Sequence, residues 1–129
     1  MTNIVDGLMY TQDDEWIKVE GDRGIVGVTD FAQASLSDIV YLELPDVGEG
    51  FDMRQRFGVI ESVKAAADLN MPVAGEVLEI NKPLLDTPGT VNADPYGKAW
   101  LVKIKLTAPE QLEELMDAEA YRSHCKARG

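Results

Sequence analysis

The sequence predicts a mainly β fold, a sandwich of two small antiparallel sheets with similar halves, to which short helices are added. Many short β-forming runs separated by turns rich in Gly, Pro or Asp indicate this fold class. The segment 100–106 alternates apolar and polar residues most regularly, as a half-buried strand does. A weak internal similarity supports the prediction of two similar halves, because residues 38–45 and 75–83 each form a predicted strand leading into a Pro-containing turn.

The N-terminal part contains predicted strands joined by tight turns. Strands are expected at 8–11, at 15–20 with Ile17 and Val19 on the buried face, at 25–29 and at 39–44. The turn 21–24 joins the second and third of these into a hairpin, and the turn 45–50 follows the fourth. Asp30 is expected to cap a helix at 31–36, with Gln33 completing a capping box.

The C-terminal part ends in predicted helices near 109–127. Five Pro and Gly residues between 81 and 98 predict a long irregular connection there and not a helix. After the strand at 100–106, Thr107–Glu110 resembles a capping box for a helix at 110–116. Asp117 is then expected to cap a second helix that continues through 121–126.

Length and charge limit the classes of partner. The 129 residues suit one compact domain, 1–129. A net charge of -11 argues against nucleic acid or an anionic membrane as partner and favours basic surfaces on other proteins. Because the sequence contains no recognisable signal peptide or apolar span, the cytosol is the expected compartment.

Residues for independent catalysis are scarce in this sequence. It has no Ser-His-Asp set, no phosphate-cradling Gly loop and no metal-ligand spacing. The only histidine, His124, stands beside the only cysteine, Cys125, and both are expected to be bystanders, with His124 solvated. The sequence therefore predicts no independent catalytic site and no metal site, which is typical of a protein that is not an enzyme.

The chain is organised around a predicted hairpin whose tip carries Lys64. A β-rich run at 57–63 leads up to this lysine, three alanines follow it, and a second β-rich run at 71–80 is expected to return. Lys64 is the only Lys or Arg from 57 to 81, so one amine stands alone at the turn. It is either a site of covalent modification or an ordinary solvated turn residue.

The residues around Lys64 resemble a known hairpin. Glu61–Ala65 and the Pro72–Val77 segment resemble the lipoyl-lysine hairpin of the glycine cleavage system H protein family. Biotin carriers usually have Met on both sides of the lysine, and lipoyl domains of 2-oxoacid dehydrogenases usually have Asp before it. Val63 and Ala65 match neither pattern. The resemblance covers nearly the whole chain, through segments within 10–16, 27–33, 38–48, 91–97, 100–104 and 118–121.

The resemblance implies a carrier with a lipoyl-domain-like barrel-sandwich hybrid fold. Lipoic acid would be joined through an amide to Lys64, and Glu61, Ser62, Val63 and Ala65 would form the recognised hairpin surface. The implied partners are glycine decarboxylase (P protein), aminomethyltransferase (T protein), dihydrolipoyl dehydrogenase (L protein) and a lipoate-attaching enzyme. The carrier, a monomer, would take the aminomethyl group of glycine from the first to the second, and electrons to the third.

The resemblance also implies a cleft that shelters the carried group from water. Glu15 and Asp68 match the family's cleft carboxylates, and a carboxylate beside a protonated amine makes a charge-assisted contact. The alternative is that Glu15 is a surface residue at a strand end and that Asp68 stabilises a turn.

Two positions depart from the family pattern. Asp14 and Phe31 stand where the family usually has His, which puts any docking or sheltering role of those histidines in doubt. Two further interpretations stay open beside the glycine cleavage carrier. One is a paralogous relay that donates lipoate to other proteins, and the other is an unmodified binding module on the same scaffold.

Overall fold

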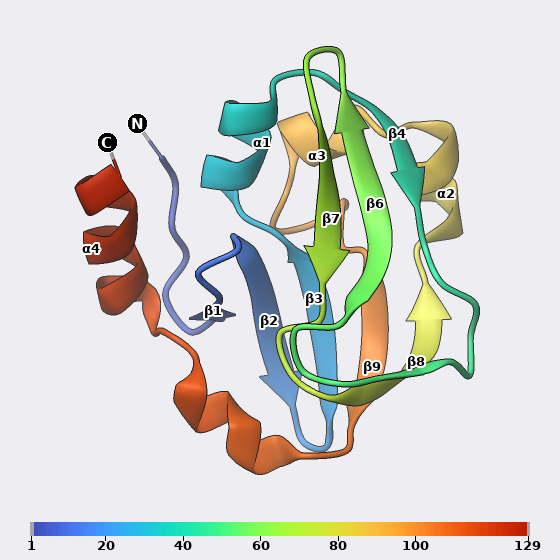
Figure 1. Cartoon of the computed structure of the whole chain (residues 1–129), viewed down its shortest axis with the longest axis vertical. Coiled ribbons are helices and arrows are strands. Elements are labelled where there is room, and N and C mark those ends of the chain that lie inside the picture. Colours follow the sequence, from blue (N-terminus) through green and yellow to red (C-terminus); the bar gives the residue numbers. More distant parts are fainter. Residues whose placement is uncertain (1, 129) are drawn as a thin grey trace.

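The computed structural model describes residues 2–128 and contains two antiparallel sheets packed over a common core (Figure 1). The larger sheet has the strand order β1-β2-β3-β9-β8-β5, and the smaller has the order β4-β6-β7. This arrangement confirms the predicted mainly β fold. The strands of the larger sheet are β1 (Met9–Tyr10), β2 (Glu15–Glu20), β3 (Arg23–Val28), β5 (Gly50–Phe51), β8 (Gly75–Ile80) and β9 (Val102–Leu106).

Strand β2 coincides with its predicted bounds and pairs with β3 from Glu15 opposite Val28 to Glu20 opposite Arg23. Its burial differs from the simple alternation that the sequence predicts. Ile17 is fully buried, but Val19 is exposed, because the outer half of the hairpin extends beyond the core. In the inner half both faces are buried, because Trp16 packs in a second cluster of buried residues that includes Tyr121 and Cys125 near the C-terminus.

The smaller sheet consists of β4 (Ile39–Glu43), β6 (Arg56–Ser62) and β7 (Ala66–Asn70). The predicted return of the hairpin at 71–80 is wrong, because the strand that pairs with β6 is β7. The segment expected to return instead crosses to the larger sheet, where β8 pairs with β9. Ala, Asp and Asn are poor strand formers, but pairing with the β-rich β6 overrides their local preference.

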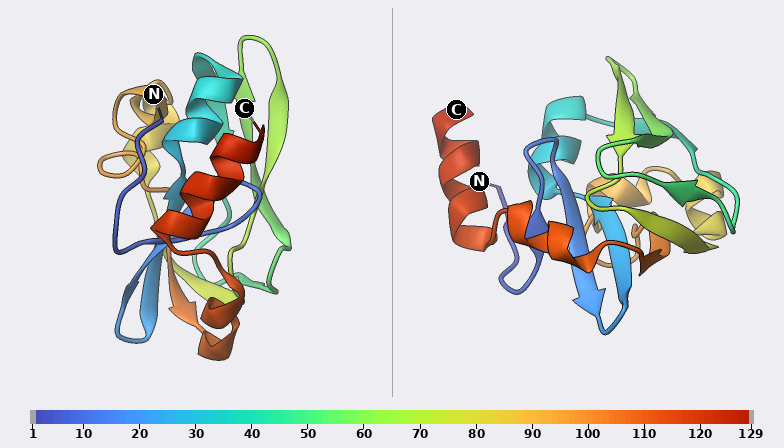
Figure 2. Two further views of the ribbon diagram at one scale, coloured as in Figure 1. Left: turned by 90° about the vertical axis from the view of Figure 1, so that its left-hand side faces the viewer. Right: turned by 60° about the horizontal axis from the view of Figure 1, so that its bottom comes forward.

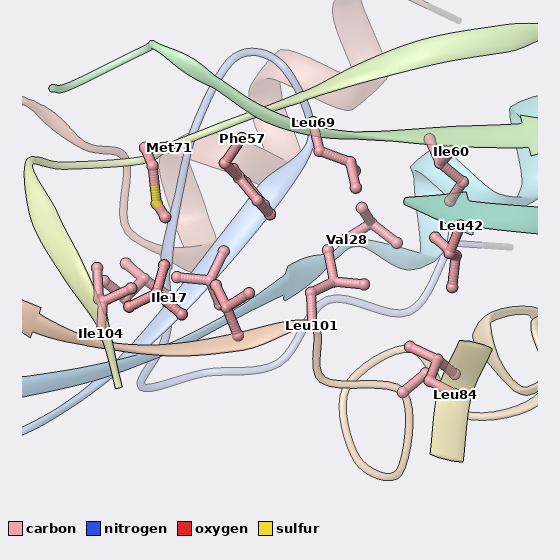
Figure 3. Packing of buried hydrophobic residues seen from close by; sticks show 14 of the residues in the cluster. Ile17, Val28, Leu42, Phe57, Ile60, Leu69, Met71, Leu84, Leu101 and Ile104 are labelled. Atoms are coloured by element: carbon pink, nitrogen blue, oxygen red, sulfur yellow. The ribbon is translucent and has the colours of Figure 1, made fainter. Parts of the chain in front are cut away.

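Apolar side chains from both sheets form the main core between them. Figure 3 shows the side chains of the smaller sheet pointing toward those of the larger sheet. The labelled members are Ile17, Val28, Leu42, Phe57, Ile60, Leu69, Met71, Leu84, Leu101 and Ile104, and all are buried. Burying one such side chain contributes roughly 1.5–3 kcal/mol. The core therefore fixes the two sheets, and with them the hairpin, to one another.

Three short helices lie in the upper part of the molecule in Figure 1. Helix α1 (Asp30–Leu36) is capped by Thr29, whose hydroxyl accepts a hydrogen bond from the Ala32 N–H, so the predicted cap at Asp30 is off by one residue. The connection 81–98 contains two short helices, α2 (Lys82–Asp86) and α3 (Thr90–Ala93), although no helix was expected there. Pro83 lies in the first turn of α2, a position where proline does not break a helix.

The C-terminal helices lie on one flank of the larger sheet (Figure 2). The first is a 3₁₀ helix, η1 (Pro109–Glu114), and the second is α4 (Ala118–Arg128). Asp117 caps α4 as predicted, because its carboxylate accepts a 2.8 Å hydrogen bond from the Ala120 N–H. Helix α4 packs through Tyr121, whose ring stacks on Tyr10 with 4.5 Å between ring centroids. Over residues 2–128, no helix has both the length and the apolar character that a membrane crossing needs.

Candidate functional site

Lys64 lies at the tip of the β6–β7 hairpin, which projects beyond the rest of the molecule at the top of Figure 1. Its side chain is exposed, and no carboxylate among residues 2–128 forms an ion pair with its ammonium. The flanking residues Val63 and Ala65 are also exposed. The structure thus places the predicted lysine where another protein can reach its amine.

The Ser62 side chain holds the backbone of the tip. Its hydroxyl oxygen accepts hydrogen bonds from the N–H groups of Lys64, at 3.2 Å, and Ala65, at 3.1 Å. The Ser62 N–H donates to the Ala65 carbonyl at 2.8 Å, and the Val63 N–H donates to the Asp38 carbonyl at 3.0 Å. Such local bonds order a turn without involving the lysine side chain. The backbone is therefore fixed while the amine stays accessible.

Glu15 is a buried carboxyl group at the start of β2. Only 2% of the residue is exposed. The Thr11 hydroxyl donates to one carboxylate oxygen at 2.7 Å, and the Asn70 N–H donates to the other at 3.4 Å. Burial, which penalises the charged form, raises the pKa of Glu15 to about 8 despite these two bonds. At neutral pH this carboxyl group is mainly protonated.

A cavity of about 190 Å³ joins Glu15 to the hairpin. Asp68, on β7, lines the same cavity, so the structure brings together the two carboxylates that the sequence singled out. Asp68 lies at the rim, where its side chain is 61% exposed and 3.7 Å from the Arg56 guanidinium. The other walls are largely apolar and come from β3, α1 and the smaller sheet: Val28, Ala32, Leu36, Ile60, Ala67 and Leu69.

A second cavity, of about 200 Å³, adjoins Glu15 and contains His124 in its lining. The prediction that His124 is solvated is only partly right, because the residue is half-buried and its Nε2 lies 3.4 Å from the Gln12 carbonyl oxygen. Arg54 lines this cavity too and has a φ of 67°, which is uncommon for a residue with a side chain. Glu15 therefore lines both cavities.

Sequence reasoning missed the groups that hold Glu15 in place. Thr11 lies in a turn four residues earlier, and Asn70 contributes only its backbone from a strand that the sequence did not predict. A Thr in a polar turn has no distinguishing signal in a single sequence. Its role becomes visible only when the turn closes against β7.

The hairpin and cleft together define a class of protein. One accessible lysine on a fixed β-turn, beside a small cleft with apolar walls and a buried carboxyl group, is the arrangement of a carrier domain that holds a covalent arm. Among residues 2–128, no three His, Cys, Asp or Glu side chains are placed to hold a metal ion together.

Comparison with known proteins specifies the family. The family model for the glycine cleavage H-protein matches residues 8–128, and the chain belongs to this family. A glycine cleavage system H protein from Halothermothrix orenii is 54% identical over 119 residues, covering 92% of this chain and 93% of that protein. One from Carboxydothermus hydrogenoformans is 46% identical over 129 residues, covering 100% and 99%.

A solved structure shares the fold. The crystal structure of a glycine cleavage system H protein from Mycobacterium marinum superposes with a TM-score of 0.86 at 36% identity. The match covers 93% of this chain and 97% of that chain. The fold and the sequence therefore point to the same family.

Proposed function

We propose that this protein is the lipoyl carrier of a glycine cleavage system, with lipoic acid attached to Lys64. The observation that carries the proposal is the accessible amine of Lys64 on a turn whose backbone is held by Ser62. Attachment through an amide needs an amine that can enter the active site of another enzyme and reach an activated carboxyl group there. An exposed lysine at a protruding tip meets that need, whereas a lysine held inside the fold does not.

The residues around Lys64 suit recognition by a lipoate-attaching enzyme. Ser62 orders the turn, Val63 and Ala65 expose small apolar surfaces on either side of the lysine, and Glu61 adds a negative charge at the end of β6. A bound lipoyl group would supply a dithiolane that accepts the carried group and undergoes thiol–disulfide exchange. The protein's own contribution is to position the attachment point and to provide the cleft.

The carrier itself would not catalyse a reaction. In the proposed cycle it serves glycine decarboxylase (P protein), aminomethyltransferase (T protein) and dihydrolipoyl dehydrogenase (L protein) in turn. A net charge of -11 would draw it to basic surfaces on these partners and make association sensitive to salt. Residues 1–129 would form a single carrier domain that is cytosolic, as expected from the sequence, and monomeric, as expected from the family resemblance.

The cleft between Glu15 and Asp68 would shelter the aminomethyl cargo between enzymes. Apolar walls exclude water, and the Asp68 carboxylate at the rim can pair with a protonated amine on its way in. Glu15 would lose its proton when such an amine approaches, because a nearby positive charge lowers the pKa of a carboxyl group. The contact formed there would then be charge-assisted, and the cleft would favour the loaded arm over the empty one.

Intact mass after co-expression with a lipoylating system tests the attachment. The native chain should gain the mass of one lipoyl group, and Lys64→Arg should gain none. As a control, Lys98→Arg, at another exposed lysine, should be modified like the native chain. A native chain that stays unmodified would support the unmodified binding module instead.

A glycine–bicarbonate exchange assay with glycine decarboxylase then separates the carrier from a lipoate relay. The lipoylated protein should support exchange, and Lys64→Arg should not. The relay interpretation keeps the hairpin and would be favoured by full lipoylation without exchange. The lipoate relay remains the second candidate because Asp14 and Phe31 stand where the family usually has His.

A further inference from the structure

The two positions that depart from the family pattern meet on one side chain, Arg128 in the last turn of α4. Its guanidinium donates two hydrogen bonds to the Asp14 carboxylate, at 3.0 and 2.6 Å. The same guanidinium lies over the Phe31 ring, with its central carbon 4.1 Å from the ring centroid. Arginine suits such a place because its planar group can bind a carboxylate in two places and stack on an aromatic face.

Asp14 is held from several sides at once. Its φ is 69°, in the left-handed region that few residues with a side chain adopt, although Asp does so more often than most. The Tyr121 hydroxyl donates to its carboxylate at 2.7 Å, and its own carbonyl accepts a 2.9 Å bond from the Thr29 N–H. The hydroxyls of Thr29 and Tyr121 are also hydrogen-bonded at 2.7 Å. Because Thr29 caps α1, the network links α4, Asp14 and α1.

The parts that Arg128 links are walls of the cleft. Asp13 and Asp14 line it from the β1–β2 connection, and Glu15 lines it from the start of β2. Ala32 and Leu36 line it from α1. Arg128 does not line the cleft. The Asp14–Arg128 pair is partly shielded from water, with side-chain exposures of 17% and 31%, so salt and solvent screen it less than a surface pair.

Arg128 also forms an ion pair with one of the two acids next to Glu15. Asp13 and Asp14 each disfavour ionisation of Glu15, and Arg128 offsets the charge of Asp14. The other charged or titratable groups that line the two cavities beside Glu15 are Tyr10, Arg54, Asp68, Glu114 and His124. None of these shares a hydrogen bond or ion pair with Arg128 within residues 2–128.

From these contacts we infer that Arg128 is a positioning residue for the cleft: through Asp14 and Phe31 it fixes two of the cleft walls and keeps the charge around Glu15 in balance. The inference rests on the proposed function in one respect, since the cleft matters only if it shelters cargo. The first test therefore uses protein without lipoate, so that it succeeds or fails independently of that function.

Three variants of α4 provide the test. Arg128→Gln removes the charge and both contacts, Arg128→Lys keeps the charge but loses the two-pronged, stacked geometry, and Arg122→Gln is the matched control. Arg122 lies on the same helix and pairs at 3.0 Å with Asp6, away from the cleft. Thermal melts establish that each variant is folded before it is compared.

Amide hydrogen exchange reports how readily the cleft walls open. In both Arg128 variants, the Asp14 and Thr29 N–H groups should exchange roughly tenfold faster than in the native protein. Lowering the free energy of local opening by about 1.4 kcal/mol raises the open population by that factor. Arg122→Gln should leave both rates near native. Native rates in Arg128→Gln, or the same acceleration in the control, would overturn the inference.

Titration of Glu15, followed by carbon NMR of labelled carboxyl groups, reports the charge. The midpoint should rise in Arg128→Gln, by roughly half a pH unit, and stay near native in Arg128→Lys. An unchanged midpoint in Arg128→Gln would contradict the charge-balancing role.

With lipoylated protein, the lifetime of the loaded cargo should shorten several-fold in both Arg128 variants and not in Arg122→Gln. If amide hydrogen exchange is faster in the Arg128 variants but the lifetime of the loaded cargo is unchanged, Arg128 does not position a sheltering cleft.

Discussion

The Thr11 hydroxyl donates a 2.7 Å hydrogen bond to the Glu15 carboxylate in a place where 2% of Glu15 is exposed. This bond and the longer one from Asn70 do not replace the water that a charged carboxylate loses on burial. Burial dominates, and the pKa of Glu15 rises to about 8. A buried acid that destabilises the fold when charged is better explained by the cleft than by folding.

Replacing this acid should change how stability depends on pH. The folded-state pKa of about 8 lies above the usual value near 4.5, so the folded protein binds more protons than the unfolded chain between these values. The contribution of Glu15 to stability is therefore lost as pH rises through that window. Glu15→Gln cannot ionise, so it should unfold like the native protein near pH 5 and be more stable by a few kcal/mol near pH 8.

Urea unfolding of both proteins across this pH range measures the difference. Glu113→Gln is the matched control, because Glu113 is exposed in η1. The difference in unfolding free energy between this variant and the native protein should be the same at every pH. If Glu15→Gln showed no growing advantage between pH 5 and 8, Glu15 would not be a protonated buried acid.

Removing the hydroxyl that orders the tip should slow lipoylation. Ser62→Ala loses the acceptor for two backbone N–H groups, so the turn around Lys64 samples more conformations. We expect a several-fold lower rate of lipoate attachment and a loss of about 0.5–1.5 kcal/mol in unfolding free energy. Ser123→Ala, at an exposed position on α4, is the control and should leave both unchanged. A native rate for Ser62→Ala would mean that the attaching enzyme orders the tip by itself.

Local patterns predict those elements whose boundaries are set by local chemistry. Alternation identified β2 and β9, and a single side-chain cap placed the start of α4. The lone amine at the tip of the hairpin was predicted in the same way. Glu15 and Asp68 were singled out only because they match the family pattern, and the shared cavity that joins them is a property of the packed sheets.

Elements decided by tertiary contacts could not be predicted in this way. Strand β7 is made of weak strand formers and exists because β6 supplies its hydrogen bonds. Thr29 caps α1 and Asp30 does not, although Asp is the better N-cap residue in isolation. Tyr121, 92 positions away, is hydrogen-bonded to Thr29 in the fold. Arg128 likewise meets Asp14 only after α4 has packed.

A glycine in the middle of β6 should tolerate no side chain. A Cβ on Gly58 would collide with the backbone carbonyl oxygen of Glu43 on the neighbouring strand β4. We therefore expect Gly58→Ala to lose at least about 1–3 kcal/mol of unfolding free energy, since a backbone group cannot move aside. Gly50→Ala faces open space and should be neutral or slightly stabilising. Equal stability of the two variants in a denaturant titration would show that β4 can shift without loss.

Deleting one hydroxyl on α4 should weaken the attachment of that helix. The Tyr121 hydroxyl donates to Asp14 and is hydrogen-bonded to Thr29, and the whole residue is buried. Tyr121→Phe keeps the stacking on Tyr10 but leaves a carboxylate oxygen and a buried hydroxyl each short of a partner, which costs about 1–3 kcal/mol. Tyr41→Phe is the matched control, because Tyr41 is exposed and its hydroxyl makes only a 3.3 Å bond to Glu43. It should change the unfolding free energy by less than about 0.5 kcal/mol. Comparable values for the two variants would mean that stacking alone docks α4, and that the hydroxyl network serves the loop at Asp14 without stabilising the helix.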